Sequence, residues 1–66
     1  MKNNIRIERA ISMLTQEDLA NKISVSRQTI NAMEAGKYVP STVLALKIAR
    51  VFNKQVEEIF ILEKGD

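Results

Sequence analysis

A polar run between residues 25 and 36, VSRQTINAMEAG, carries side chains that can form paired hydrogen bonds. When this run is wound as a helix at about 100° per residue, Ile30 and Met33 fall together on one side. Arg27, Gln28 and Asn31 then share the opposite half of the helix. An ordinary surface helix usually carries Glu and Lys at such positions, so this face indicates a more specific role.

The chemistry that this face offers is recognition of base edges in double-stranded DNA. Arg can bond guanine at two atoms, and Gln and Asn can do the same to adenine. Ala32 and Ala35 are small enough to let the backbone approach a groove, where a methyl group can pack on a thymine methyl. A solvated face without a binding function is the alternative, because these residue types are common on surfaces. The predicted base contacts are Arg27, Gln28, Asn31 and, at the edge of the buried side, Thr29, which can instead support the helix.

Polar residues on both sides of this run suit contacts with DNA phosphates. Gln16 begins the preceding predicted helix, where its amide and the free backbone N–H groups can hold a phosphate. Lys37 and Tyr38 follow the run in one loop, although Tyr38 can instead cover the core. The predicted phosphate contacts are Gln16, Ser26, Lys37, Tyr38 and Ser41.

Two predicted helices, 16–23 and 26–35, position these side chains. Thr15 and Asp18 form a capping-box pattern before the first helix, and Ser26 is an N-cap candidate for the second. The turn of about three residues between them is typical of a helix-turn-helix. So short a turn forces the two helices to cross steeply and presents the second one outward.

The rest of the chain is also predicted to be helical. The apolar spacing predicts helices over 5–13, 41–52 and 55–60, and 41–52 is apolar nearly all round, as expected of a central helix. The short ends KNNI and FILEK can pair as a two-stranded ribbon. The sequence therefore predicts an all-α, five-helix domain, with a short β-ribbon between the two ends as a further possibility.

The length and composition bound the class of protein. Sixty-six residues fit one domain over 1–66, with the helix-turn-helix at about 16–35. No apolar run approaches the ~20 residues of a membrane span, and the N-terminus has no signal-peptide pattern. The absence of cysteine excludes disulfides and thiolate chemistry and fits a cytoplasmic location.

The charges are unevenly distributed along the chain. Residues 19–56 have six basic side chains and one acid, whereas residues 1–18 are neutral and residues 57–66 carry a net charge of −3. A basic middle favours an anionic partner such as nucleic acid. The alternative is chance segregation of a few charges in a short chain.

Two further sets of residues have predicted structural roles. Arg9 on the first helix and Glu34 on the flank of the 26–35 helix are expected to form an ion pair that joins the two helices. The apolar run near the C-terminus exceeds what one small core needs, and ordinary core is the alternative to a dimer contact. The predicted dimer interface is Ile59, Phe60, Ile61 and Leu62.

The stretch TQEDLANKISVSRQTINAMEAGKYVPSTVLALKIARVF, together with Arg9, resembles the Cro- and lambda-repressor-like helix-turn-helix family, often called the XRE type. The resemblance covers about residues 5–60 and is most like the small stand-alone dimeric repressors. It implies five helices, a two-fold dimer and a palindromic operator. It also implies base reading by Arg27, Gln28 and Asn31, with Thr29 and Gln16 near the DNA backbone, and a structural pair of Arg9 and Glu34.

Two positions depart from the family pattern. Ser24 replaces the usual glycine of the turn and must adopt a positive φ or reshape the turn. Ala32 replaces a residue that in some relatives is a long polar base reader, which leaves base discrimination to fewer side chains.

The sequence therefore predicts a homodimeric transcription regulator, in the first instance a repressor, that binds double-stranded DNA. The alternative is an antitoxin or a restriction-modification controller protein of the same fold, acting through a protein partner. An enzyme is poorly supported, because the chain has no His, no Cys, no glycine-rich phosphate loop and no metal-ligand cluster. No cofactor, metal or small-molecule ligand is expected.

Overall fold

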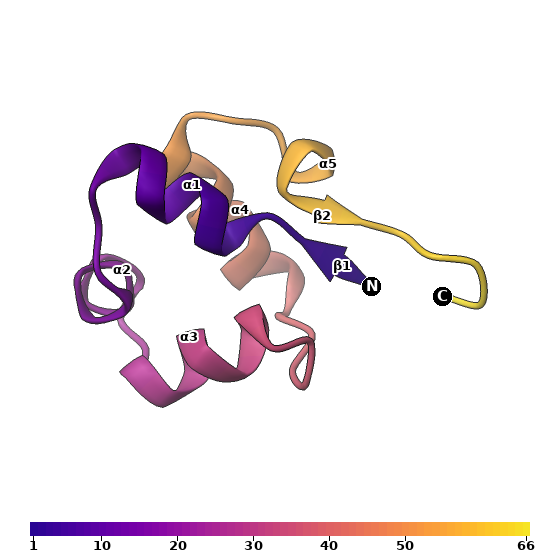
Figure 1. Cartoon of the computed structure of the whole chain (residues 1–66), viewed down its shortest axis with the longest axis horizontal. Helices are drawn as coiled ribbons and strands as arrows, with labels where there is room; N and C mark the ends of the chain where they lie inside the picture. Colours follow the sequence, from indigo (N-terminus) through magenta and orange to yellow (C-terminus); the bar gives the residue numbers. More distant parts are fainter.

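The computed structural model describes residues 1–66 and consists of five helices and a two-stranded antiparallel sheet (Figure 1). The elements follow in the order β1 (Lys2–Asn3), α1 (Ile5–Ser12), α2 (Gln16–Ile23), α3 (Arg27–Glu34), α4 (Thr42–Phe52), α5 (Val56–Ile59) and β2 (Phe60–Ile61). The predicted five-helix fold and the ribbon between the two ends are therefore confirmed. No helix has both the length and the apolar character needed to cross a lipid bilayer.

Short polar side chains cap the starts of three helices, at Thr15 and Ser26 as predicted and also at Ser41. Thr15 Oγ1 accepts a hydrogen bond from the backbone N–H of Asp18 at 3.0 Å, and Asp18 Oδ2 accepts one from the N–H of Thr15 at 2.9 Å. Ser26 and Ser41 cap α3 and α4, each accepting from the N–H three residues further on. Each such cap stabilises a helix by about 1 kcal/mol and fixes the residue at which it begins.

Three helices end on a residue in the left-handed region that is not glycine. Met13, Ser24 and Asn53 follow α1, α2 and α4 with φ of 57°, 60° and 53°. Of the two alternatives that the sequence leaves open for Ser24, a positive φ or a reshaped turn, the structure shows the positive φ. The short turn is obtained at the cost of backbone strain, because a β-carbon crowds the carbonyl oxygen in this region.

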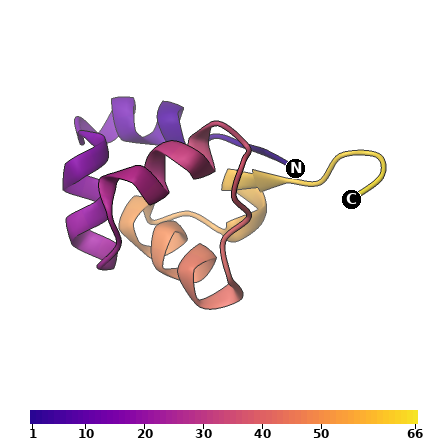
Figure 2. The same cartoon turned by 90° about the horizontal axis from the view of Figure 1, so that it is seen from below.

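The core lies where all five helices meet. Its fully buried side chains come from α1, α2, α3, α4 and α5, and are Ile5, Leu19, Ile30, Met33, Ile48 and Ile59. Figure 2 looks onto α3, which lies across one side of the domain and turns its Ile30 and Met33 inward. The predicted buried side of α3 is therefore confirmed.

The burial of the C-terminal residues corrects part of the predicted dimer interface. Ile59 has no exposed surface and Phe60 is also buried in the core cluster, because β2 turns the chain end back onto the helices. Ile59 therefore has no surface to offer a partner, and Phe60 has only 8% of its surface exposed. Ile61 and Leu62 are exposed and stay a prediction.

The ribbon ties both ends of the chain to α3. Its antiparallel register pairs Lys2 with Ile61 and Asn3 with Phe60. The Asn3 side-chain amide reaches further and donates to the backbone oxygen of Met33 at 2.8 Å. The same oxygen also accepts from the N–H of Gly36 at 3.0 Å, so the Asn3 amide is a second donor that holds this end of α3 against the ribbon.

Relief of the strain at Ser24 is testable. We expect Ser24→Gly to raise the free energy of unfolding by about 0.5–1 kcal/mol, since glycine adopts a positive φ without the side-chain penalty. As the control, Asn21→Gly at an exposed interior position of α2 should lower it by about 0.3 kcal/mol, the difference between Asn and Gly in helix propensity. Urea unfolding measures both. A loss of stability in Ser24→Gly similar to that of the control would contradict the strain at the turn.

Candidate nucleic-acid interface

The helix-turn-helix unit consists of α2, the turn at Ser24 and Val25, and α3. The N–H of Val25 donates to the backbone oxygen of Ala20 at 3.0 Å, which closes the end of α2 and redirects the chain. Leu19 and Ile23 of α2 and Ile30 of α3 are buried in the same core cluster. The inner side of α3 is therefore fixed by α2, and its outer side lies along the lower edge of the domain in Figure 1.

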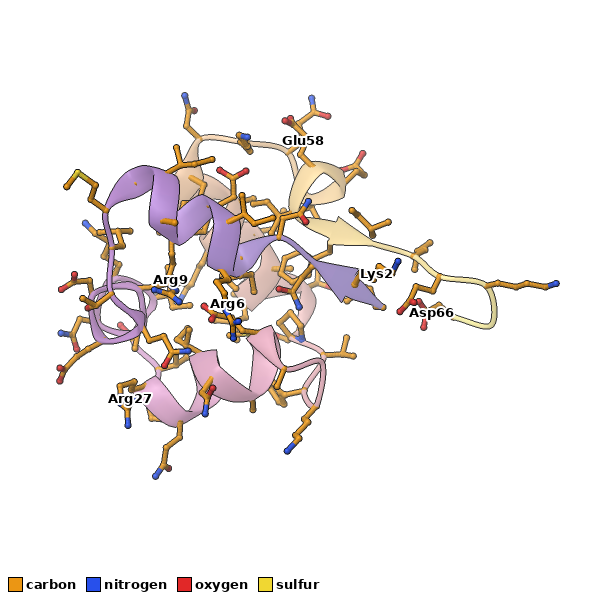
Figure 3. The ribbon with its side chains drawn as sticks, in the orientation of Figure 1. Lys2, Arg6, Arg9, Arg27, Glu58 and Asp66 are labelled. Atoms are coloured by element: carbon orange, nitrogen blue, oxygen red, sulfur yellow. The ribbon has the colours of Figure 1, made fainter.

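The outer side of α3 carries the three side chains predicted to read bases. Arg27, Gln28 and Asn31 are all exposed, and Figure 3 shows Arg27 at the start of α3 pointing away from the domain. Ala32 is half-buried and Ala35 is exposed. The face thus presents forked hydrogen-bonding groups on a helix that is narrow enough to enter a major groove about 12 Å wide.

Ser26 and Thr29 are bonded to each other at the start of α3. Ser26 Oγ accepts from the N–H of Thr29 at 3.1 Å, and the two hydroxyl oxygens are 2.9 Å apart. The two side chains therefore stabilise the first turn of α3. A hydroxyl can accept and donate at the same time, so one hydroxyl hydrogen of the pair remains for a phosphate or a base.

A buried carboxylate at the other end of α3 joins three helices. Glu34 has 1% of its side chain exposed, and Arg9 of α1 donates to both carboxylate oxygens, from Nε at 2.6 Å and from Nη2 at 3.1 Å. Gln16 at the start of α2 donates from Nε2 to Glu34 Oε1 at 3.1 Å. The predicted ion pair between Arg9 and Glu34 is thus present, with an amide of α2 added to it.

The hydrogen bond to Glu34 uses part of the Gln16 amide that was predicted to contact a phosphate. The sequence predicts a phosphate contact for its amide, whereas in the structure one amide hydrogen is committed to Glu34. The second amide hydrogen and the free N–H groups of the first turn of α2 remain for a phosphate. Gln16 is therefore held in place at the point where α2 begins.

The electrostatics of Glu34 follow from these partners. Burial acts to raise the pKa of the Glu34 carboxyl, but hydrogen bonds from Arg9 and Gln16 and the charge of Arg9 hold that pKa below its ordinary value. The Arg9 guanidinium has its own pKa raised by the hydrogen bond with Glu34. Both groups are thus charged at neutral pH, and the pair is a permanent cross-link between α1 and α3.

The loop after α3 holds the remaining predicted phosphate contacts. Lys37 and Tyr38 have exposed side chains, and the N–H of Lys37 donates to the backbone oxygen of Ala32 at 2.9 Å. Ser41 Oγ accepts from the N–H of Leu44 at 3.2 Å as the cap of α4, and its hydroxyl hydrogen stays available to a phosphate. These residues follow the C-terminal end of α3, whereas Arg27 lies at its N-terminal end.

Arg6 is a basic residue of this region that the sequence did not single out. Its Nε lies 3.5 Å from Glu34 Oε1, and its side chain is 74% exposed. Arg6 precedes Arg9 by three residues, so both fall on the same side of α1. This spacing was the available signal, because it places a second guanidinium beside the residue already expected to bind Glu34.

Comparison with known proteins agrees with this geometry. A helix-turn-helix family model matches residues 5–59. A Methanocaldococcus jannaschii protein named as an uncharacterized HTH-type transcriptional regulator is 59% identical over 66 residues, covering 100% of both chains. Proteins of the same description from Archaeoglobus fulgidus and Bacillus subtilis are 52% and 45% identical, covering 96% and 97% of this chain and 90% and 97% of their own.

The role of Glu34 generates a prediction about stability and pH. Because the folded-state pKa is lowered, Glu34 stabilises the fold fully above its unfolded-state pKa of about 4.3, and this stabilisation is lost as the pH falls through the folded-state value. At pH 7 we expect Glu34→Gln to lower the free energy of unfolding by about 3 kcal/mol, because it leaves the buried guanidinium of Arg9 without its countercharge.

Urea unfolding at pH 7 and at pH 3 measures this effect. The difference between the wild type and Glu34→Gln should be smaller at pH 3 than at pH 7, because the stabilisation by the wild-type carboxylate is lost as the pH falls. Asp18 also has a lowered pKa, owing to its bonds with Thr15, so some acid dependence remains in the variant. Glu17→Gln, at an exposed position of α2, is the control and should change little. Equal pH dependence in the wild type and Glu34→Gln would contradict the role of this carboxylate.

Proposed function

The chain belongs to the helix-turn-helix family, and from this premise we propose that it is a sequence-specific, DNA-binding transcription regulator. In this proposal α3 enters the major groove with Arg27, Gln28 and Asn31 toward the bases. The observation that carries it is the exposure of these three side chains on a helix whose opposite side is buried and whose end is fixed by Glu34. The regulator acts in the simplest case as a repressor, by occupying an operator that overlaps a promoter.

Contacts with the DNA backbone would set the register of α3 in the groove. Phosphate contacts orient a protein on the duplex without reading its sequence. The start of α2 with Gln16 lies at one side of α3, and the loop with Lys37, Tyr38 and Ser41 follows its end. Two such anchors beside one inserted helix would hold the base-reading side chains at a fixed depth.

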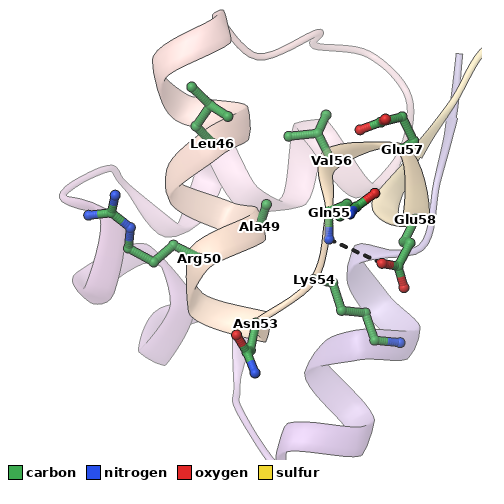
Figure 4. Close-up of a pocket in the computed structure, with 9 residues that line it drawn as sticks. All are labelled: Leu46, Ala49, Arg50, Asn53, Lys54, Gln55, Val56, Glu57 and Glu58. Atoms are coloured by element: carbon green, nitrogen blue, oxygen red, sulfur yellow. Dashed lines mark hydrogen bonds between the residues drawn. The ribbon is translucent and has the colours of Figure 1, made fainter.

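The regulator is proposed to bind a palindromic operator as a homodimer. The surface that favours this lies on α4 and α5, where Val43 and Leu46 are exposed and Val56 lines the same groove as Leu46. Figure 4 shows Arg50 on the α4 side of this groove and Glu57 on the α5 side. A two-fold axis through the apolar centre would bring the basic side of one copy to the acidic side of the other.

In this proposal the surface of α4 and α5 takes the place of the buried Ile59 and Phe60 in the predicted interface. Ile61 and Leu62 are exposed beyond the ribbon and stay candidates for contact with the second copy. A dimer of this kind would place the two α3 helices in successive major grooves, roughly 34 Å apart.

The assignment of base readers predicts different effects for two basic residues. Arg27→Ala should weaken binding to the best site by about 5- to 150-fold, equivalent to about 1–3 kcal/mol, and relax preference at one base pair. Lys37→Ala is the matched comparison and should weaken binding to all duplexes alike, with a salt slope smaller by about 0.9. Titrations against the best site and its single-base variants measure both. An unchanged site preference in Arg27→Ala would show that this residue reads no base.

The proposed dimer surface is tested with a charge at its centre. Leu46→Glu should raise the dissociation constant of the dimer more than about tenfold, since an unpaired charge is costly to bury. Ile11→Glu is the control, because Ile11 is a similarly exposed apolar residue on α1, outside this surface. Sedimentation velocity over a range of concentrations measures the dissociation. A wild-type dissociation constant in Leu46→Glu would contradict this surface, and Ile61 and Leu62 would then be the next candidates for the interface.

A further inference from the structure

We propose that Arg6 of α1 is a DNA-phosphate anchor, held by Glu34 beside the start of α2. The proposal rests on the DNA-binding function above and adds a helix that lies outside the helix-turn-helix unit. Figure 3 shows Arg6 between α1 and α3, on the side of α1 that faces α3, the proposed recognition helix. Three observations carry the proposal: the charge balance around Glu34, the free atoms of Arg6, and its neighbours.

The charge of Arg6 is not needed to neutralise Glu34. Arg9, with only 15% of its side chain exposed, already donates to both carboxylate oxygens. Arg6 therefore adds a second positive charge beside a single negative one. Arg6, Arg9 and Glu34 together carry one net positive charge, which favours an anionic ligand, whereas the first turn of α2 adds the acids Glu17 and Asp18.

The atoms of Arg6 that bind anions best remain free. The contact with Glu34 uses Nε at 3.5 Å, which is longer than the 2.7–2.9 Å of a strong charge-assisted hydrogen bond. The two terminal nitrogens have no partner within the chain. An arginine in this state can offer a pair of N–H groups to two oxygens of one phosphate. The link to Glu34 limits the movement of the side chain, so less entropy is lost on binding.

The neighbours of Arg6 place it where a phosphate would lie. Glu34 Oε1 is shared, because it also accepts from Gln16 Nε2 at the first residue of α2. Arg6 and the start of α2 are thus held by one oxygen atom. In a helix-turn-helix, the helix before the recognition helix crosses the DNA backbone. A phosphate that meets the free N–H groups of α2 would therefore lie beside the free nitrogens of Arg6.

The test is Arg6→Gln, measured as DNA affinity against salt concentration. We expect affinity for the best site to fall about tenfold at 0.1 M salt and the salt slope to fall by about 0.9, as for the loss of one phosphate contact. Base preference and the urea midpoint of unfolding should not change, because the side chain is exposed and its ion pair is long. Lys64→Gln removes the same charge from the exposed tail and should leave the salt slope as in the wild type.

Methylphosphonate substitution at single positions of the half-site then identifies the phosphate. At one position, neutralising the phosphate should lower the affinity of the wild type but should not further lower the affinity of Arg6→Gln. If Arg6→Gln keeps the wild-type slope and responds to every neutralised phosphate as the wild type does, the anchor is wrong, although the proposed function stands. If the wild type itself binds no duplex specifically, both proposals fail.

Discussion

The buried carboxylate of Glu34 is the constraint on which the rest of the domain depends. A charge with almost no exposed surface is stable only when it is paired and hydrogen-bonded, and here the partners come from two other helices, through Arg9 and Gln16. The carboxylate belongs to the last residue of α3. Satisfying it therefore fixes the end of α3 relative to α1 and the start of α2, which apolar packing alone would position less uniquely.

The start of α3 is fixed by different means. The hydroxyls of Ser26 and Thr29 complete its first turn, and the left-handed Ser24 keeps the turn before it short. With both ends held and Ile30 buried between them, α3 is preorganised before any ligand arrives. A preorganised helix loses little entropy on binding, which favours discrimination by a few side chains such as Arg27.

Much of this architecture follows from local sequence signals. The caps at Thr15 and Ser26 and the buried side of α3 each depend on residues within one or two turns, so they could be predicted from the sequence. Long-range contacts were harder to predict from the sequence. The burial of Phe60, for example, depends on how β2 folds back on the core. The hydrophobicity of the C-terminal residues alone did not distinguish core residues from interface residues. The spacing of Arg6 and Arg9 could be interpreted only from the structure, which places Glu34 between α1 and α3.

In the proposed function, each of two copies of the chain places one rigid helix, α3, in the major groove to read the DNA sequence. Selection from randomised duplex DNA, followed by titration of the enriched site against salt, tests it most directly. We expect an enriched palindrome with half-sites about one helical turn apart, roughly 34 Å, bound much more tightly than random duplex. No enriched site, with only weak binding that disappears as salt is raised, would contradict it and direct attention to a protein partner.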